Sequence, residues 1–198
     1  MAPGARPTEV LVVGASGLLG ASLMAELAST GIDATGTFLT RAGPRLLALD
    51  LSNRESVSRA LDELHPRVVI NTAAESNVDL CEREPEHSYR VNVETVVTLA
   101  RACHEVGSRL LTFSSDYVFG DSDGPHEDGE TPAPLNVYGQ HKLEAEGLAD
   151  EMVEDHLVIR VCNLYGYQAG GKNFVMGLIE RLSKGRPVQV PHDQWGSP

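Results

Sequence analysis

A tyrosine and a lysine in the central part of the chain have the spacing of an acid/base pair. Tyr138 and Lys142 lie four positions apart in a segment, residues 135–153, whose pattern predicts a helix. Side chains at positions i and i+4 share one face of a helix. An ammonium group beside a phenol stabilises the phenolate and lowers a pKa that is about 10 in isolation. The pair is therefore suited to moving a proton to or from a carbinol oxygen.

Ser115 adds a hydroxyl that suits the same chemistry. It follows the apolar strand candidate 109–113. A serine hydroxyl can hydrogen-bond a carbonyl oxygen and stabilise the charge that develops on it. Taken alone, the Tyr138–Lys142 spacing is also common among solvent-exposed helix residues. The strand-end serine, together with a glycine-rich turn earlier in the chain, favours the catalytic interpretation.

That glycine-rich turn lies between a predicted strand, residues 9–13, and a predicted helix, residues 18–29. A turn from a strand into a helix exposes backbone N–H groups at the positive end of the helix dipole, which favours a pyrophosphate. Glycines let the backbone approach the anion and let the helix pack closely on the strand. A purely structural tight turn is the alternative. The expected cofactor contacts in this turn are Gly14, Ser16, Gly17, Leu18, Leu19 and Gly20.

The end of the second predicted strand favours NADP as the dinucleotide. An acidic residue there would hydrogen-bond the ribose of NAD. Residues 36–41 contain no carboxylate, whereas Arg41 and two threonine hydroxyls could hold a 2′-phosphate. NAD stays an alternative, since Arg41 could also be a solvated loop charge.

Two further strand ends are expected to contact the cofactor. Asp50 and Leu51 follow the third predicted strand, and the Asp50 carboxylate could reach the adenine amino group. Ala73 and Ala74 follow the fourth predicted strand, residues 67–70. Small side chains at that position leave room for a cofactor across the strand ends, where open α/β sheets bind ligands.

Strand-like and helix-like segments alternate along the chain, which predicts an α/β fold with a doubly wound, Rossmann-like parallel sheet. The strands are continuous apolar runs, as expected when helices cover both faces. Ser52 and Glu55 suggest a capping box at the start of one helix, and Pro85 and Gly107 suggest the ends of another. The strands are expected at residues 9–13, 32–39, 45–49, 67–70, 109–113, 157–161 and 188–190, and the other helices at 135–153 and 173–184.

Composition limits the partners. The 198 residues contain 16 Lys and Arg against 28 Asp and Glu, a formal net charge of −12. This excess argues against nucleic acid and anionic membranes, which would repel the chain. No apolar run approaches the roughly 20 residues that span a bilayer, and the N-terminus does not resemble a signal peptide. We therefore expect a cytoplasmic protein whose three widely spaced cysteines are buried thiols, with no metal site.

The chain resembles the extended short-chain dehydrogenase/reductases and, among them, the dTDP-4-dehydrorhamnose reductase group. The resemblance implies reduction of a nucleotide-activated 4-keto-6-deoxy sugar, with Ser115 as the hydroxyl partner, Tyr138 as the acid and Lys142 as its activator. It also implies a substrate site near Val78, Asn173 and Gln194. The matching stretches are GASGLLG (14–20), NTAAESNVDLCEREPE (71–86), FSSDYVFGD (113–121), PAPLNVYGQHKLEAE (132–146), NFVMGLIERL (173–182) and DQWGSP (193–198).

One position departs from the group's pattern. Asn163 stands where rhamnose-forming members usually carry a tryptophan near the sugar. We count it among the candidate substrate-binding residues, with the sugar left open. The methionine adenosyltransferase regulatory β subunits share the same motifs, so a non-catalytic NADP-binding subunit is an alternative. A sugar-nucleotide epimerase or dehydratase is another.

The resemblance also suggests a domain organisation. We expect a flexible N-terminus at residues 1–8, a cofactor-binding domain with the catalytic residues at 9–166, and the start of a substrate-binding lobe at 167–198. Members of the group continue well beyond this point, so the lobe is expected to be truncated. The long helices predicted at 85–106 and 135–153 could pair in the four-helix contact of a homodimer.

Overall fold

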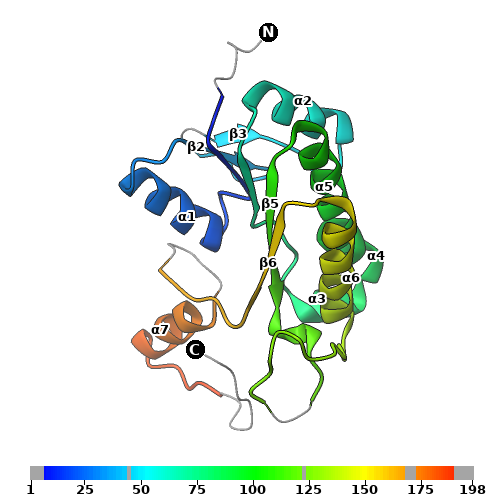
Figure 1. Ribbon diagram of the computed structural model, residues 1–198. Coiled ribbons are helices and arrows are strands. Elements are labelled where there is room, and N and C mark those ends of the chain that lie inside the picture. The colour runs from blue at the N-terminus through cyan, green and yellow to red at the C-terminus, as the bar shows by residue number, and fades with distance from the viewer. Residues whose placement is uncertain (1–6, 44–45, 122–123, 168–172, 190–198) are drawn as a thin grey trace. The chain divides into compact units, whose positions relative to one another are not determined.

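The computed structural model describes residues 7–43, 46–121, 124–167 and 173–189. Its centre is a six-stranded sheet in the order β3-β2-β1-β4-β5-β6 (Figure 1). The pairs β1/β2, β2/β3, β1/β4 and β4/β5 are all parallel. The predicted doubly wound parallel sheet is therefore confirmed. The strands are β1 (Val10–Val13), β2 (Ala34–Phe38), β3 (Leu46–Ala48), β4 (Val68–Asn71), β5 (Arg109–Ser115) and β6 (His156–Val161).

The strand order reverses direction between β1 and β4. From β1 the chain runs outward to β2 and β3, then returns to place β4 on the other side of β1. The loops that leave β1 and β4 therefore diverge at the carboxyl edge of the sheet. In open α/β sheets this switch point is where ligands bind.

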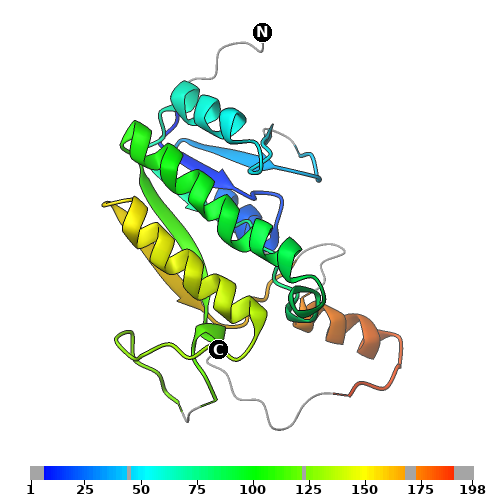
Figure 2. The same ribbon diagram turned by 90° about the vertical axis from the view of Figure 1, so that its right-hand side faces the viewer.

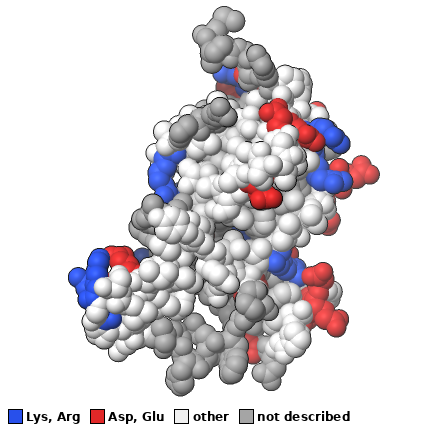
Figure 3. All heavy atoms as spheres, turned by 90° about the vertical axis from the view of Figure 1, so that its left-hand side faces the viewer, with Lys and Arg blue, Asp and Glu red and all other residues white. Residues whose placement is uncertain are grey.

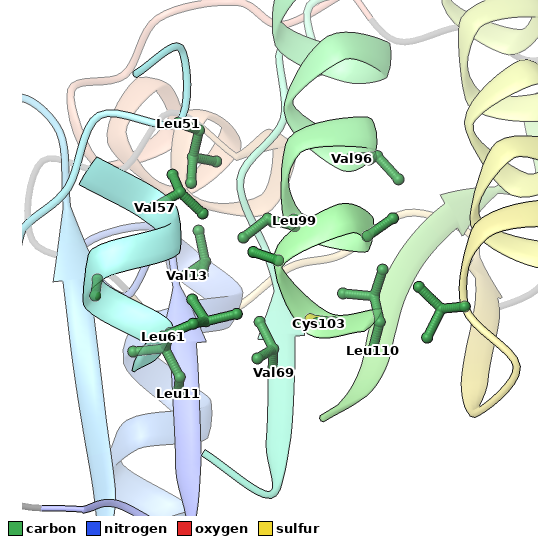
Figure 4. Close-up of a cluster of buried hydrophobic side chains, with 14 of the residues drawn as sticks. Leu11, Val13, Leu51, Val57, Leu61, Val69, Val96, Leu99, Cys103 and Leu110 are labelled. Atoms are coloured by element: carbon green, nitrogen blue, oxygen red, sulfur yellow. The ribbon is translucent and has the colours of Figure 1, made fainter. Parts of the chain in front are cut away.

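Alternate residues of β1 build two separate cores. Leu11 and Val13 face α2 (Arg54–Leu64) and α5 (Thr95–Val106) and belong to the larger cluster (Figure 4). Val10 and Val12 face the opposite side and pack with Met24 and Leu27 of α1 (Leu18–Ser29). This alternation follows from the two-residue period of a strand, and it explains why a strand covered on both faces is apolar throughout.

Helix α6 (Val137–Met152) completes the layer on the side of α2 and α5, while α1 covers the other face (Figure 1). Helices α5 and α6 lie side by side along the sheet (Figure 2). Ala145 and Ala149 of α6 are buried in the larger core. Their small side chains allow close approach, so the helix is seated firmly against the sheet.

The segment between β4 and α5 differs from the predicted single helix that begins at Pro85. It contains two short helices, α3 (Val78–Arg83) and α4 (Pro85–Tyr89), followed by a π-helical turn, η1 (Arg90–Glu94), that leads into α5. A π-helical turn inserts an extra residue and is frequent at functional sites. The predicted end is confirmed, because Gly107 caps α5 with a φ of +70°.

Two smaller predictions are wrong. The N-cap of α2 is Asn53, whose side-chain oxygen accepts a hydrogen bond from the backbone N–H of Ser56. Ser52 instead bonds to Asp50. The short strand predicted at residues 188–190 does not form at residues 188 and 189, and Val190 lies outside the described residues.

The chain divides into two compact units, Met1–Arg160 and Val161–Pro198. The first contains nearly all of the sheet. The second contains α7 (Phe174–Ser183), whose N-cap is Asn173 and in which no residue is buried. Apolar side chains of α7 are exposed, among them Phe174 and Leu182.

Charge and helix length agree with the composition. On the described part of the face shown in Figure 3, basic and acidic side chains occur in small separate groups. None of the helices in the described ranges combines the length and apolar character that crossing a membrane requires.

Candidate functional site

The glycine-rich turn after β1 forms where the sequence predicts it. Gly14 has a φ of +79°, a region that favours glycine. A Cβ atom at this position would lie 2.9 Å from the backbone nitrogen of Ala73. A Cβ at Gly20 would lie 2.5 Å from the Gly14 carbonyl oxygen. Both glycines are therefore needed for the close approach of the turn, α1 and the loop after β4.

Helix α1 begins without a side-chain cap. Its N-cap is Gly17, and no side chain accepts from the first turn. The first N–H groups of a helix have no acceptor within the helix, so those of Leu18, Leu19 and Gly20 are oriented for an external anion. The turn thus has the backbone chemistry that binds a pyrophosphate.

A cavity of about 340 Å³ lies at the carboxyl edge of the strands. This volume falls within the usual range for small-molecule and cofactor sites. Four of the residues predicted to contact a cofactor line it: Gly14, Asp50, Leu51 and Ala73. The other lining residues are Val13, Thr37, Phe38, Leu39, Leu49, Ser52, Arg90, Val91 and Thr95.

Sequence reasoning missed the contribution of the turn η1 to this cavity. Arg90 and Val91 come from η1, and Thr95 is the first residue of α5. The predicted single helix gave no reason to expect these residues at the carboxyl ends of the strands. They lie there because of the π-helical turn, and the spacing of apolar residues in the sequence does not reveal such a turn.

The other predicted cofactor residues do not line the cavity, namely Ser16, Gly17, Leu18, Leu19 and Gly20 of the glycine turn, Arg41 and Ala74. Ala74 is exposed, one residue beyond Ala73. Arg41 is exposed two residues beyond Leu39, and it makes no hydrogen bond or ion pair with the described part of the chain. Ser16 is half-buried in the glycine turn.

The Asp50 carboxylate is held in place at the cavity wall. The Ser52 hydroxyl donates to its Oδ1 atom at 2.7 Å, and the Ser52 backbone N–H donates to the same atom at 2.9 Å. These two hydrogen bonds lower the pKa of Asp50. The side chain is therefore ionised and fixed in orientation at neutral pH, as a hydrogen-bond acceptor must be.

The predicted acid/base pair lies on the buried side of α6. Tyr138 is 8% exposed and Lys142 is 6% exposed. The start of the helix packs closely on the turn η2 (Asp116–Val118), because Gly139 has no side chain and leaves room for the carbonyl oxygen of Tyr117. The ring of Tyr117 meets the ring of Tyr138 edge-on, with 5.8 Å between their centroids.

Ser115 and Tyr138 are brought together at the end of β5. Ser115 is close enough to Tyr138 to lower the pKa of its phenol, an effect that burial outweighs. The Ser115 hydroxyl donates to Oδ1 of Asp116 at 3.0 Å and accepts from the backbone N–H of Tyr117 at 3.3 Å. These two hydrogen bonds fix the orientation of the Ser115 side chain near Tyr138.

Burial shifts both members of the acid/base pair. It raises the pKa of Tyr138 to about 12, and the nearby Ser115 side chain only partly opposes this. Burial lowers the pKa of Lys142 to about 8, while the Glu146 carboxylate favours the charged form. The sequence argument expected Lys142 to lower the tyrosine pKa, but burial dominates and Lys142 is not among the groups that shift it. At neutral pH, Tyr138 is therefore a phenol that holds its proton and Lys142 is mostly an ammonium.

The candidate substrate-binding residues are placed as follows. Val78 is half-buried and begins α3. Asn163 is exposed after β6 in the second unit. Asn173, also in the second unit, uses its side chain to accept from the N–H of Met176 at 3.1 Å and to donate to the carbonyl oxygen of Gly166 at 2.8 Å. Gln194 lies outside the described residues.

Within the described residues, no group of three or more His, Cys, Asp or Glu side chains is arranged to hold a metal ion. Cys81 and Cys103 are buried thiols. Burial raises the pKa of both, so neither has the thiolate character of a reactive cysteine.

Comparison with known proteins places this geometry in a family. Residues 8–198 match the family described as the RmlD substrate binding domain. The chain belongs to the RmlD family. The resemblance to extended short-chain dehydrogenase/reductases drawn from the motifs is thereby confirmed, and the glycine turn, Ser115, Tyr138 and Lys142 all lie inside the matched range.

Two kinds of curated relative are similar to this RmlD family member. A dTDP-4-dehydrorhamnose reductase of Escherichia coli (strain K12) is 35% identical over 150 residues, covering 75% of this chain and 50% of the relative. The methionine adenosyltransferase 2 subunit beta of Danio rerio is 35% identical over 177 residues, covering 89% of this chain and 54% of the relative. The chain thus spans about half the length of these relatives.

A solved RmlD structure has the same fold. The dTDP-4-dehydrorhamnose reductase of Bacillus anthracis str. Ames, determined in complex with NADP, aligns with a TM-score of 0.80 at 33% identity. The alignment covers 94% of this chain and 62% of that one.

Proposed function

We propose that this chain carries the cofactor-binding and catalytic part of an NADPH-dependent reductase whose substrate is a nucleotide-activated 4-keto-6-deoxy sugar. The observation that supports this best is the placement of three buried side chains together: Ser115 at the end of β5 lies near Tyr138 of α6, and Lys142 is buried on that same helix. The Escherichia coli and Bacillus anthracis relatives are dTDP-4-dehydrorhamnose reductases. We assign residues 9–166 to the cofactor-binding domain and residues 167–198 to the beginning of the substrate lobe.

The residues present fit a dinucleotide. A side chain at Gly14 or Gly20 would collide with backbone atoms, and the uncapped N–H groups at the start of α1 suit close approach of a pyrophosphate. The cavity formed by Asp50, Leu51 and Ala73 suits the adenosine end, with the fixed Asp50 carboxylate as an acceptor for the adenine amino group. When bound, the reduced cofactor supplies the hydride.

The proton comes from the chain's own residues. Ser115 and Tyr138 donate hydrogen bonds to the substrate carbonyl oxygen and polarise the bond. As the carbonyl carbon takes up the hydride with its two electrons, the oxygen becomes an alkoxide and takes the proton of Tyr138. The product is a carbinol, and Tyr138 is left as a phenolate that the Lys142 ammonium stabilises. A pKa of about 12 keeps Tyr138 protonated before the reaction, as reduction requires.

A substitution at Tyr138 tests this function. The absorbance of NADPH is followed while the purified protein is mixed with a panel of 4-keto sugar nucleotides. We expect oxidation by the wild-type protein and a loss of at least about 100-fold in Tyr138→Phe, since general acid catalysis contributes about that much. NADPH affinity should be unchanged. Full turnover by Tyr138→Phe would contradict the proposal.

A second candidate function is a cofactor-binding regulatory subunit without turnover. Similarity to methionine adenosyltransferase 2 subunit beta, which extends over 89% of this chain, favours it. It predicts that the wild-type protein binds NADPH but oxidises none with any sugar nucleotide, and that it forms a stable complex with a catalytic subunit. The same assay, together with a titration of NADPH binding, separates the two candidates.

A further inference from the structure

A chain of buried polar contacts connects the loop after β4 to the helix that carries Tyr138 and Lys142. It runs from the backbone of Glu75 to Asn92 in the turn η1, then to Ser88 on α4, and ends at His141 on α6. His141 lies directly before Lys142 in the sequence. None of these four residues is among the catalytic, cofactor-binding or substrate-binding residues predicted from the sequence.

Asn92 clamps the loop at two points. Its side-chain oxygen accepts from the backbone N–H of Glu75 at 3.1 Å, and its side-chain nitrogen donates to the carbonyl oxygen of Glu75 at 3.0 Å. Asn92 is 1% exposed. Each backbone group of Glu75 thus has a partner supplied by one amide. The clamped loop contains Ala73, which lines the proposed cofactor cavity.

Ser88 carries the contact onward to α6. It is fully buried, and its oxygen accepts from the Asn92 side-chain nitrogen at 3.2 Å. The same oxygen lies 2.8 Å from Nδ1 of His141. A hydroxyl has two lone pairs and one proton. One lone pair accepts from the Asn92 amide, and the contact with Nδ1 of His141 uses either the proton or the second lone pair.

The contact with Ser88 fixes the orientation of the His141 ring, because it holds Nδ1 against a buried hydroxyl. Burial lowers the pKa of His141, which favours a neutral ring. The ring is further held by the edge of Tyr89, with 5.3 Å between the ring centroids.

We propose that Ser88 and His141 are positioning residues, which set α6 against the loop after β4 so that Tyr138 and Lys142 are correctly placed relative to the cofactor. This inference rests on the proposed reductase function. The hydrogen bond acts at a point three residues after Tyr138 and one before Lys142, so a shift of α6 there moves both. A displacement of about 1 Å at a reacting group can cost about 100-fold in rate.

Two substitutions of His141 separate positioning from packing. Asparagine places a hydrogen-bonding amide close to the position of Nδ1, whereas leucine fills the space without a hydrogen-bonding group. We expect His141→Leu to lower kcat about tenfold or more, with NADPH affinity within about twofold, and His141→Asn to retain most of kcat. A residue that only packs would tolerate leucine at least as well as asparagine, and that result would overturn the inference.

Ser88→Ala supplies a second test should His141→Leu fail to fold. It removes one oxygen and is expected to lower kcat to a similar degree, while Ser88→Thr, which keeps the hydroxyl, restores it. Tyr89→Phe is the control. It removes the exposed hydrogen bond from Tyr89 to Glu144, which is 2.7 Å long, and should leave kcat unchanged. Equal kcat in Ser88→Ala and Tyr89→Phe would contradict the inference.

A readout without turnover keeps this inference separate from the proposed function. Nitrogen NMR of His141 should show an Nδ1 chemical shift that changes in Ser88→Ala. Amide hydrogen exchange at Glu75 should be faster in Asn92→Ala. If no sugar nucleotide is reduced but these changes appear, the proposed function fails and the contact chain stands. An Nδ1 shift that is the same in Ser88→Ala as in the wild-type protein would overturn the chain itself.

Discussion

The carboxylate of Glu82 accepts a hydrogen bond from the backbone N–H of Val137 at 2.7 Å. Val137 is the first residue of α6, and Tyr138 is the next. Glu82 lies on α3, so the segment after β4 holds the start of the helix with the acid/base pair as well as its middle. A negative charge at a helix N-terminus is favourable, because it complements the helix dipole.

Glu82→Ala should destabilise the protein by about 0.5–1 kcal/mol, the usual cost of losing an exposed N-terminal helix contact. It should also lower kcat, because the first turn of α6 loses an anchor next to Tyr138. Glu82→Gln keeps an acceptor oxygen and should retain more of both properties. Urea unfolding and NADPH oxidation measure these effects. The control is Glu86→Ala on α4, and equal stability of Glu82→Ala and Glu86→Ala would refute the role of Glu82.

The pH dependence of turnover should report Lys142. Its pKa is lowered to about 8 by burial, so the ammonium is present below that pH and is lost above it. Because the ammonium stabilises the phenolate left on Tyr138, kcat/KM for reduction should be level below about pH 8 and fall above it. Lys142→Arg should remove this fall, since a guanidinium does not titrate there. A wild-type profile that stays level up to pH 10 would exclude Lys142 as the titrating group.

The same lowered pKa has a consequence for stability. Lys142 has a pKa of about 8 in the folded protein against an ordinary value of 10.5, so the unfolded chain binds more protons between these values. The free energy of unfolding should therefore rise as pH increases from about 8 to 10.5. Lys142→Met should stabilise the protein at pH 7 by up to about 3 kcal/mol while abolishing turnover. If Lys142→Met is less stable than the wild-type protein at pH 7, the buried ammonium group of Lys142 does not lower the free energy of unfolding.

Two glycine substitutions compare a crowded position with an open one. A Cβ at Gly20 would lie 2.7 Å from the Cα of Ala15, so Gly20→Ala should cost about 1–3 kcal/mol through overpacking and weaken NADPH binding. Gly147 lies in α6 and a Cβ there would meet nothing within 4 Å. Gly147→Ala should stabilise by about 0.5–1 kcal/mol, with NADPH binding intact. Thermal unfolding and a cofactor titration measure both, and equal behaviour of the two variants would contradict the close packing of the turn.

The sequence predicted those features whose causes are local. The helix over residues 18–29 has the predicted bounds, because the glycine turn before it and its periodicity are both local signals. Gly107 ends α5 for the same kind of reason. Six of the seven strand candidates lie within a few residues of the observed strands, since a run of buried apolar residues is visible in the sequence itself.

The features that the sequence did not predict depend on distant contacts. The turn η1 directs Asn92 to Glu75, 17 residues away, and no helical period shows this. Ser52 and Asn53 are both good N-cap residues, and the sequence alone does not choose between them. Asn53 caps α2 because the Ser52 hydroxyl is already bonded to Asp50. The raised pKa of Tyr138 follows from burial, which spacing alone does not give.

The choice between NADPH and NADH should depend on Arg41. Arg41 is exposed beyond Leu39, a wall residue of the cavity, in the region where an arginine accommodates the 2′-phosphate of NADP. A charge-assisted hydrogen bond of about 1.5–3 kcal/mol corresponds to about 10–100-fold in affinity. Arg41→Ala should therefore raise the Kd of NADPH by about that factor and leave the Kd of NADH within about twofold. The control is Arg59→Ala on α2, which should change neither Kd. If Arg41→Ala weakens both cofactors equally, the arginine does not read the phosphate, and the absence of a carboxylate after β2 must be explained in another way.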